Sequence, residues 1–272
     1  ANSGKNKMNF FPFNPVDGMF IDFLEKLFLK NQYDIVQVEY TTLLSLIHIL
    51  PKNSVKVFVQ IENRYSILQD YFFKNKNNSL YADYIIENAK FTEISLMNKY
   101  DYIVALNNND KETLGQYLDK EKIVLAPFPI LDSLTSVDDQ VRFSKDQVNK
   151  LIFLGSQLHL PNEDAVSWFA EEMYEQIYTK YKLKLYVTGV WSKNFIKKYP
   201  NIVFTGYVDN LASLIKNSIV ISPIRLGGGG IRAKVLQAMA MRVPLISTAL
   251  GSEGITDLKN NENIYIADNK EQ

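Results

Sequence analysis

The residues best suited to chemistry lie in one glycine-rich segment, Pro223–Ala240, which reads PIRLGGGGIRAKVLQAMA. Its four glycines leave backbone N–H groups uncovered by side chains, and a helical pattern starts directly after them at Ile231. The first amides of a helix have no internal partners and lie at the positive end of its dipole. Arg225, Arg232 and Lys234 add positive charge nearby. This combination indicates a site for a phosphate or diphosphate group.

A tight turn between a strand and a helix, with solvated basic residues, would have the same composition. For a glycine-rich turn taken alone, the plain turn is the favoured interpretation. Two known phosphate motifs are excluded. No Gly-Lys-Ser/Thr follows at the spacing of a Walker loop. The dinucleotide fingerprint belongs in the first βα unit of a domain, whereas this segment comes late in one.

The elements that position this segment alternate between strand and helix patterns, which predicts an α/β protein with parallel sheets. Helices are expected at 20–28, at 80–99, after a cap formed by 107–110, from about 162, at 211–216 and at 231–241. The polar stretch 131–150 is the candidate linker, which predicts two domains, 1–140 and 141–272. The predicted strands cover residues 33–40, 55–61, 102–106, 123–125, 151–154, 183–187, 202–204, 218–222, 244–248 and 264–267.

Composition excludes several classes of protein. The chain has 272 residues, 30 basic and 30 acidic, so no net field attracts nucleic acid, and no nucleic-acid partner is expected. It has no cysteine, which excludes disulfides and thiolate metal sites and fits the reducing cytoplasm. No segment approaches the roughly 18 apolar residues of a membrane span. The polar start of the sequence lacks a signal-peptide core.

The order of four motifs resembles family 4 glycosyltransferases of the GT-B fold, in the subgroup with a glycine-rich loop. They are Leu151–Ser156 with Pro161-Asn162 and Trp168-Phe169, then Thr205–Asp209, then the glycine-rich segment, then Pro244–Thr248 with Gly251–Ile255. The resemblance is weaker upstream, and an opening strand with its loop is missing. It implies two Rossmann-like domains of GT-B type, a first acceptor-side domain that is incomplete, and a second domain that binds a nucleotide sugar.

The resemblance also implies roles for individual residues. Arg232, Lys234 and Glu253 are the candidate catalytic residues, with the two cations neutralising the donor diphosphate and Glu253 bordering the sugar. Gln237 takes the place of a glutamate that binds the ribose, and its amide oxygen can still accept hydrogen bonds. Ser156 replaces the first member of a basic pair. The candidate substrate-binding residues are Gly155, Ser156, Tyr207, Val208, Arg225, Gly229, Gly230, Ile231 and Gln237.

The implied reaction moves a sugar from a nucleoside-diphosphate sugar to a glycan or lipid-linked acceptor, with retention of configuration. It needs no metal or other cofactor. The expected location is the cytoplasm, and contact with the inner face of the membrane stays open. A non-catalytic nucleotide-binding or interaction module on the same fold is the alternative, and a phosphate-sugar isomerase or epimerase is a third. The donor sugar, base, acceptor, linkage, oligomeric state and activity of this shortened chain are not determined.

Other candidates are weaker. Glu39 and Glu62 follow predicted parallel strands, where catalysis and ordinary polar capping are equally good interpretations. Glu93 is expected on a solvated helix face, and His48 is expected to pack in an apolar run. His159 is expected in a surface loop.

Overall fold

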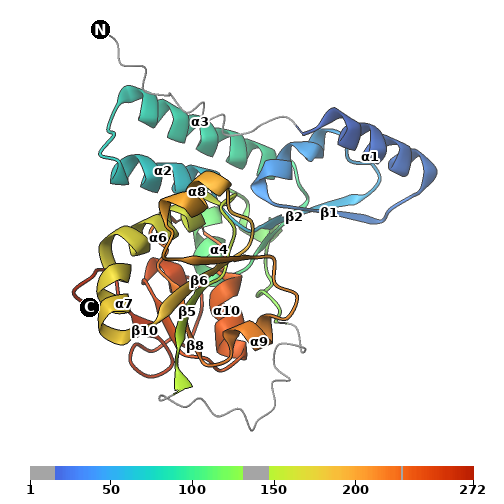
Figure 1. Cartoon of the computed structure of the whole chain (residues 1–272). Helices are drawn as coiled ribbons and strands as arrows, with labels where there is room; N and C mark the ends of the chain where they lie inside the picture. Colours follow the sequence, from blue (N-terminus) through green and yellow to red (C-terminus); the bar gives the residue numbers. More distant parts are fainter. Residues whose placement is uncertain (1–15, 131–146, 228) are drawn as a thin grey trace. The chain divides into compact units, whose positions relative to one another are not determined.

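The computed structural model describes residues 16–130, 147–227 and 229–272 (Figure 1). Its contacts divide the chain into two compact units. The first comprises residues 1–127 together with 228–230, and the second comprises 128–227 and 231–272. The predicted boundary at residue 140 lies outside the described residues. The α/β class with parallel sheets is confirmed, because every paired strand runs parallel to its neighbour.

The first unit contains a four-stranded sheet in the order β1-β2-β3-β4. Each strand therefore pairs with the next one along the chain, and Val38 on β1 lies opposite Phe58 on β2. The central strands are rich in valine and isoleucine, whose branched side chains suit a pleated surface that is covered by helices. The strands are β1 (Ile35–Glu39), β2 (Val55–Gln60), β3 (Tyr102–Ala105) and β4 (Ile123–Leu125).

Local sequence accounts for where the helices of the first unit begin. Asp17, Ser79 and Asn107 are the N-caps of α1, α3 and α4, and each side chain accepts a backbone N–H from the first turn. Phe58 and Tyr100 are fully buried at the centre of this unit's core. The helical segments are α1 (Gly18–Lys30), η1 (Thr41–His48), α2 (Arg64–Lys74), α3 (Leu80–Met97), α4 (Asn108–Leu114) and η2 (Lys120–Lys122).

The second unit contains a six-stranded sheet in the order β10-β9-β8-β5-β6-β7. The chain builds outward from β5 to β6 and β7, then returns to the other side of β5 to form β8, β9 and β10. The strand order therefore reverses between β5 and β8. The strands are β5 (Lys150–Phe153), β6 (Lys184–Thr188), β7 (Val203–Gly206), β8 (Ser218–Ser222), β9 (Leu245–Ser247) and β10 (Tyr265–Ile266).

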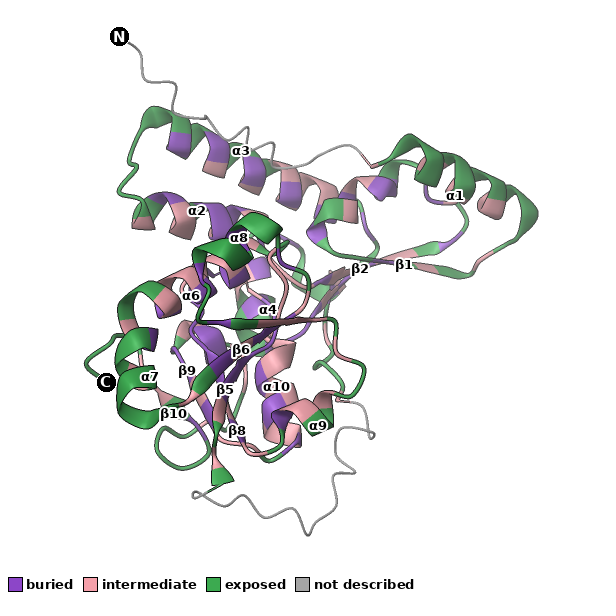
Figure 2. Cartoon of the chain, in the orientation of Figure 1, coloured by how far each residue is buried: buried purple, intermediate pink, exposed green. Residues whose placement is uncertain are grey.

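Alternating side chains of this sheet pack into two separate hydrophobic cores, one on each face. Leu151 and Phe153 of β5 pack into one cluster with the α6–α8 region, while Ile152 packs into the other with Val235 of α10. Figure 2 shows the buried band that runs through β5 and β8. The helical segments are α6 (Leu160–Phe169), η4 (Ala170–Tyr174), α7 (Glu175–Tyr181), α8 (Lys193–Lys198), α9 (Leu211–Ile215), α10 (Ala233–Ala240) and η5 (Leu250–Ser252).

All ten predicted strands are present, with ends that differ by at most two residues. The helix after the glycines begins at Ala233, two residues later than predicted, so Ile231 and Arg232 precede it. The predictions did not include α2 or α8. Among the described helices, none is long and apolar enough to cross a membrane.

Candidate functional site

The candidate site lies in the second unit, at the edge of the sheet where its parallel strands end. Gly155 follows β5, and the glycine-rich segment follows β8, which is the neighbour of β5 in the sheet. The strand order reverses between these two strands. Open α/β sheets bind their ligands outside the carboxyl ends of the strands at such a switch point. The helices α6 and α10, which follow β5 and β8, begin beside it.

A side-chain hydrogen bond joins the first turns of these two helices. The Lys234 Nζ of α10 donates to Asn162 Oδ1 of α6 at 2.6 Å. The Asn162 Nδ2 in turn donates to the Ser156 carbonyl oxygen at 3.0 Å, in the turn after β5. Asn162 is buried, at 7% exposure. The side-chain amide of Asn162 therefore links the turn after β5, the start of α6 and the start of α10.

The amine of Lys234 lies in an apolar setting although the residue as a whole is only partly buried. Its Nζ is 4.3 Å from the centroid of the Phe153 ring. Desolvation, with a smaller contribution from the neighbouring Arg232 cation, lowers the pKa of Lys234 to about 7. Among the described residues no carboxylate forms an ion pair with it. Binding of an anion would therefore raise the pKa of this amine and increase its charged fraction.

The guanidinium of Arg225 is bound by two residues of the second unit. Its Nη2 and Nε donate to the two carboxylate oxygens of Asp164 at 2.7 and 3.1 Å. Its guanidinium also lies 4.6 Å from the centroid of the Trp168 ring. This two-point bond with a stacked ring fixes the plane of the guanidinium. Its positive charge is largely offset by Asp164, so Arg225 is less available to a diphosphate than Lys234.

The turn after β5 needs glycine at position 155. Gly155 has φ +152°, and a Cβ on it would lie 2.6 Å from Asn162 Nδ2. Its carbonyl oxygen accepts from Trp191 Nε1 at 3.0 Å, and its N–H donates to Thr188 Oγ1 at 3.2 Å. Hydrogen bonds to Trp191 and Thr188 of the second unit therefore hold the turn in this conformation. The role of Gly155 in binding the substrate stays a prediction.

The predicted backbone donors have different surroundings. In the described part of the chain, no acceptor takes the N–H of Ile231, Ala233 or Lys234. Contacts group Gly229 and Gly230 with the first unit, where the Gly230 N–H donates to Asp110 Oδ2 at 2.6 Å. That amide is therefore already satisfied by a carboxylate. Both glycines have left-handed backbone, with φ near +71°, which disfavours any other residue.

The remaining predicted residues lie around the same sheet edge of the second unit. Tyr207 follows β7 and is 83% exposed. Val208 beside it is partly buried, as is Gln237 on α10. Glu253 is exposed at the end of η5, which follows β9. Their side chains make no hydrogen bond within the described residues, and a ligand can therefore meet them without breaking one.

The first unit has its own buried polar groups at the ends of its strands. Gln60, at 0% exposure, donates through Nε2 to Asn63 Oδ1 at 2.7 Å. Its Oε1 is buried and finds no partner among the described residues. Glu39 is exposed and accepts from Gln37 Nε2 at 2.7 Å. The choice between catalysis and capping for Glu39 and Glu62 stays open.

Two predictions about the first unit are wrong. Glu93 does not lie on a solvated face: it is fully buried, and one carboxylate oxygen accepts the Tyr65 N–H at 3.2 Å. Burial raises the pKa of Glu93 well above its usual range. It was misread because α2, which covers this face of α3, was not predicted. His48 does not pack inside, because it is exposed at the end of η1.

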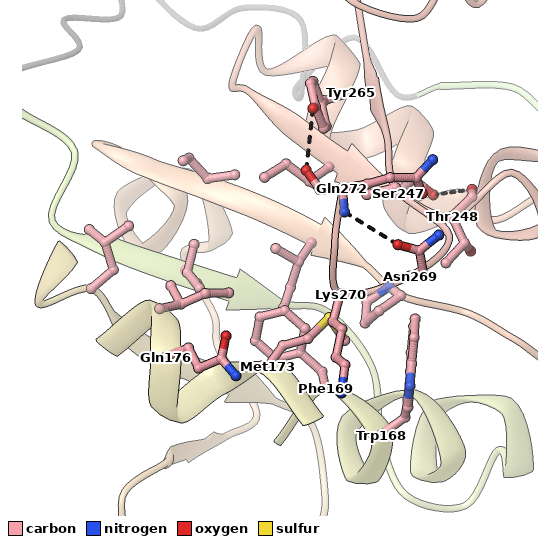
Figure 3. Close-up of a pocket in the computed structure, with 18 of the residues that line it drawn as sticks. Trp168, Phe169, Met173, Gln176, Ser247, Thr248, Tyr265, Asn269, Lys270 and Gln272 are labelled. Carbon is pink, nitrogen blue, oxygen red and sulfur yellow. Dashed lines mark hydrogen bonds between the residues drawn. The ribbon is translucent and has the colours of Figure 1, made fainter. Parts of the chain in front are cut away.

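An apolar groove of ≈ 550 Å³ in the second unit is the main alternative location for a ligand. In Figure 3, Trp168, Phe169 and Met173 line one side and the segment from Asn269 to Gln272 lines another. None of the predicted site residues lines it. A diphosphate needs convergent donors and cations. The lining of this groove is largely apolar, and of its two lysines, Lys180 and Lys270, the second pairs with Glu172. The switch point is therefore the better candidate.

Sequence reasoning missed the parts played by Asn162 and Asp164. Asn162 bonds to a residue 72 positions away, and Asp164 to one 61 positions away. Neither pair has a spacing pattern that local periodicity can reveal. The only available signal was the Pro-Asn motif itself, which marks the start of α6.

The second unit is similar in sequence to a known enzyme family. Residues 148–272 match the family model described as glycosyl transferases group 1. The match covers the described part of the second unit almost completely and under half of the 272-residue chain. A curated relative, an uncharacterized 44.6 kDa protein in the cps region of Klebsiella pneumoniae, is 23% identical over 267 residues. That alignment covers 91% of this chain and 65% of the relative.

Solved structures with the same fold are glycosyltransferases. TarM of S. aureus, in complex with UDP, has a TM-score of 0.55 at 16% identity, over 80% of this chain and 41% of its own. The pneumococcal O-GlcNAc transferase GtfA, with UDP and GlcNAc, has a TM-score of 0.55 at 15% identity, over 90% and 47%. Anabaena HepE, in complex with UDP, has a TM-score of 0.55 at 11% identity. That alignment covers 93% of this chain and 70% of HepE.

These similarities establish the fold as α/β with Rossmann-like units of GT-B type. Within the second unit, residues 148–272 are similar to the group 1 glycosyl transferases. The chain spans between 41% and 70% of the length of these relatives. Family 4 and its glycine-rich-loop subgroup stay predictions.

Proposed function

We propose that this protein is a retaining glycosyltransferase that takes a sugar from a nucleoside-diphosphate sugar and passes it to a glycan or lipid-linked acceptor. The family match of residues 148–272 and the fold shared with glycosyltransferases support sugar transfer. The observation that carries the proposal for this chain is the convergence of α6, α10 and Lys234 at the switch point of the second sheet. That is where a diphosphate finds donors and positive charge.

The residues at this edge divide the work by their chemistry. The amides of Ile231, Ala233 and Lys234 and the amine of Lys234 bind the diphosphate, and Arg232 adds charge beside it. As the glycosidic bond breaks, negative charge grows on the leaving phosphate, and these fixed donors stabilise it. Glu253 borders the sugar and Gln237 the ribose. Tyr207 and Val208 present backbone to the base.

The most direct test is binding of the leaving group. Titration of the protein with UDP and with GDP, followed by calorimetry, measures the affinity for the diphosphate and the preference for a base. Saturable binding of one of them below millimolar concentration supports the proposal. Failure of both to bind at millimolar concentration contradicts it. Transfer is then tested with labelled nucleotide sugars and lipid-linked or glycan acceptors, and the anomer of the product reports retention.

A second candidate is a nucleotide-binding module that does not transfer sugar. The neutral Gln237 and the satisfied Gly230 amide favour it, because both weaken the grip on a donor. Binding of UDP or GDP without transfer to any acceptor by the full-length protein would favour this candidate. Detectable transfer would remove it. The location of the protein in the cytoplasm, or at the membrane surface, belongs to the same proposal.

A further inference from the structure

The atom assignment of the Asn162 amide is fixed by its two neighbours. The charged lysine amine can only donate, so the atom that faces it at 2.6 Å is the amide oxygen. The Ser156 carbonyl can only accept, so the atom that faces it at 3.0 Å must be the amide nitrogen. The reverse orientation would place two donors together and two acceptors together. Asn162 therefore links the turn after β5 to the start of α10 in one orientation.

Lys234 keeps capacity for a ligand after these contacts. An ammonium group has three N–H donors. One bonds to Asn162, and the amine also lies against the face of Phe153. No described residue accepts a further hydrogen bond from it. At least one donor therefore remains, beside the N–H of Lys234 itself and that of Ala233 at the start of α10.

The neighbouring carboxylate does not neutralise this amine. Asp164 lies on α6, as Asn162 does, but both of its oxygens bond to Arg225. The other groups that face the amine are the Phe153 ring from β5 and the Arg232 cation from the turn before α10. The site therefore combines donors and positive charge without an internal anion at Lys234. An added anion of suitable size would complete it.

We propose that Asn162 is the positioning residue that holds the Lys234 amine at the switch point, where the amine binds the diphosphate of the donor. Asn162 itself does not touch the ligand, because it is buried and both its polar atoms bond within the domain. A lysine side chain loses considerable rotamer freedom on binding. Holding the amine in advance removes part of that loss from the binding step. The inference rests on the proposed function for the identity of the ligand.

The same arrangement explains why position 155 is glycine. A Cβ on Gly155 would lie 2.6 Å from Asn162 Nδ2 and 2.9 Å from its Cγ. Any larger residue would push the amide away from Ser156 and thus away from Lys234. Gly155, Asn162 and Lys234 therefore act as one unit, although 79 positions separate its ends in the sequence.

Proton uptake gives a readout that a merely structural role would not change. Burial and Arg232 lower the pKa of Lys234 to about 7, so about half of the amine is neutral at pH 7 in the free protein. A bound diphosphate favours the charged amine and raises its pKa. Binding at pH 7 should therefore take up about half a proton at Lys234. Uptake is measured by calorimetry in two buffers of different ionisation enthalpy.

The experiment measures binding of inorganic pyrophosphate, of UDP and of GDP to the whole chain and to five variants. Asn162→Ala should weaken pyrophosphate binding about tenfold, as expected for the loss of one positioning hydrogen bond. Lys234→Met should weaken it about a hundredfold and remove the proton uptake. The double variant should match Lys234→Met within about twofold, because Asn162 acts only through the lysine. Asn263→Ala is the matched control, since both polar atoms of its amide also bond within the second unit.

Asn162→Asp keeps the shape of the side chain and tests the reasoning if the alanine variant fails to fold. Its carboxylate would pair with Lys234 and keep the amine charged, so proton uptake should disappear and pyrophosphate should bind less tightly than to the wild type. Independent, additive losses for Asn162→Ala and Lys234→Met would overturn the inference. So would absence of pyrophosphate binding to the wild type. Pyrophosphate binding that follows these expectations without tighter binding of UDP or GDP would instead contradict the proposed function alone.

Discussion

Replacing Lys234 by methionine should change how the stability of the second unit depends on pH. The pKa of this amine falls from 10.5 to about 7 in the folded protein. Because the folded state binds the proton less tightly than the unfolded state, the lysine lowers stability fully below pH 7. This cost disappears as the pH rises from about 7 toward 10.5. The wild type should therefore gain stability from this group across that window, and Lys234→Met should not.

The size of the effect follows from the shift. Each unit of pKa difference corresponds to 1.36 kcal/mol. Between pH 7 and pH 9 the unfolded lysine stays protonated while the folded one loses its proton, which gives a gain of about 2 kcal/mol. The hydrogen bond to Asn162 is present in either protonation state of the amine. Its loss shifts the variant's stability by a similar amount at both pH values and leaves the difference in slope intact.

The two tryptophans make the assay specific. Trp168 and Trp191 are the only ones in the chain, and both belong to the second unit. Urea unfolding followed by tryptophan fluorescence at pH 7, 8 and 9 therefore reports on the unit that contains Lys234. Lys197→Met, at an exposed position of α8, is the control for loss of a lysine. Equal pH slopes for the wild type and Lys234→Met would refute the reasoning.

Three further outcomes are expected. Gly155→Ala should weaken pyrophosphate binding about tenfold, because its Cβ would displace Asn162; unchanged affinity by calorimetry would contradict this. Glu93→Gln should remove a loss of stability that the wild type shows as the pH rises above 4.5, since the folded state holds that carboxyl proton more tightly; thermal unfolding followed by circular dichroism at pH 5 and 8 measures it. Arg225→Lys should lower the free energy of unfolding by about 1 kcal/mol, since an amine cannot make both bonds to Asp164; in an Asp164→Asn background the same change should cost less.

The alternation of strands and helices was predictable because it is a local property. Valine-rich runs such as β2 and the N-caps such as Asn107 depend on neighbours within a few residues. The helix α2 was not predicted, although Tyr65, Leu68 and Phe72 recur at helical spacing and pack against α3. That omission produced the error at Glu93. A helix face can be assigned to solvent only when every element that covers it is known.

The sequence by itself predicted the type of chemistry. Four glycines before a helix, with three nearby cations, made this segment a candidate anion site, although a plain strand-to-helix turn has the same composition. It did not determine which cation is available. Tertiary structure decided that Arg225 is paired with Asp164, that Lys234 lies on Asn162 and Phe153, and that Gly230 donates to a carboxylate.

The physical reason is distance along the chain. A charge is neutralised, or loses its water, through groups that folding brings within about 4 Å. For Lys234 and Arg225 those groups come from α6, more than 60 positions earlier. Their arrival depends on the strand order, which returns the chain to the other side of β5. The residue types could thus be read from the sequence. Their charge states and partners depend on the strand order of the second sheet, which brings α6 beside α10.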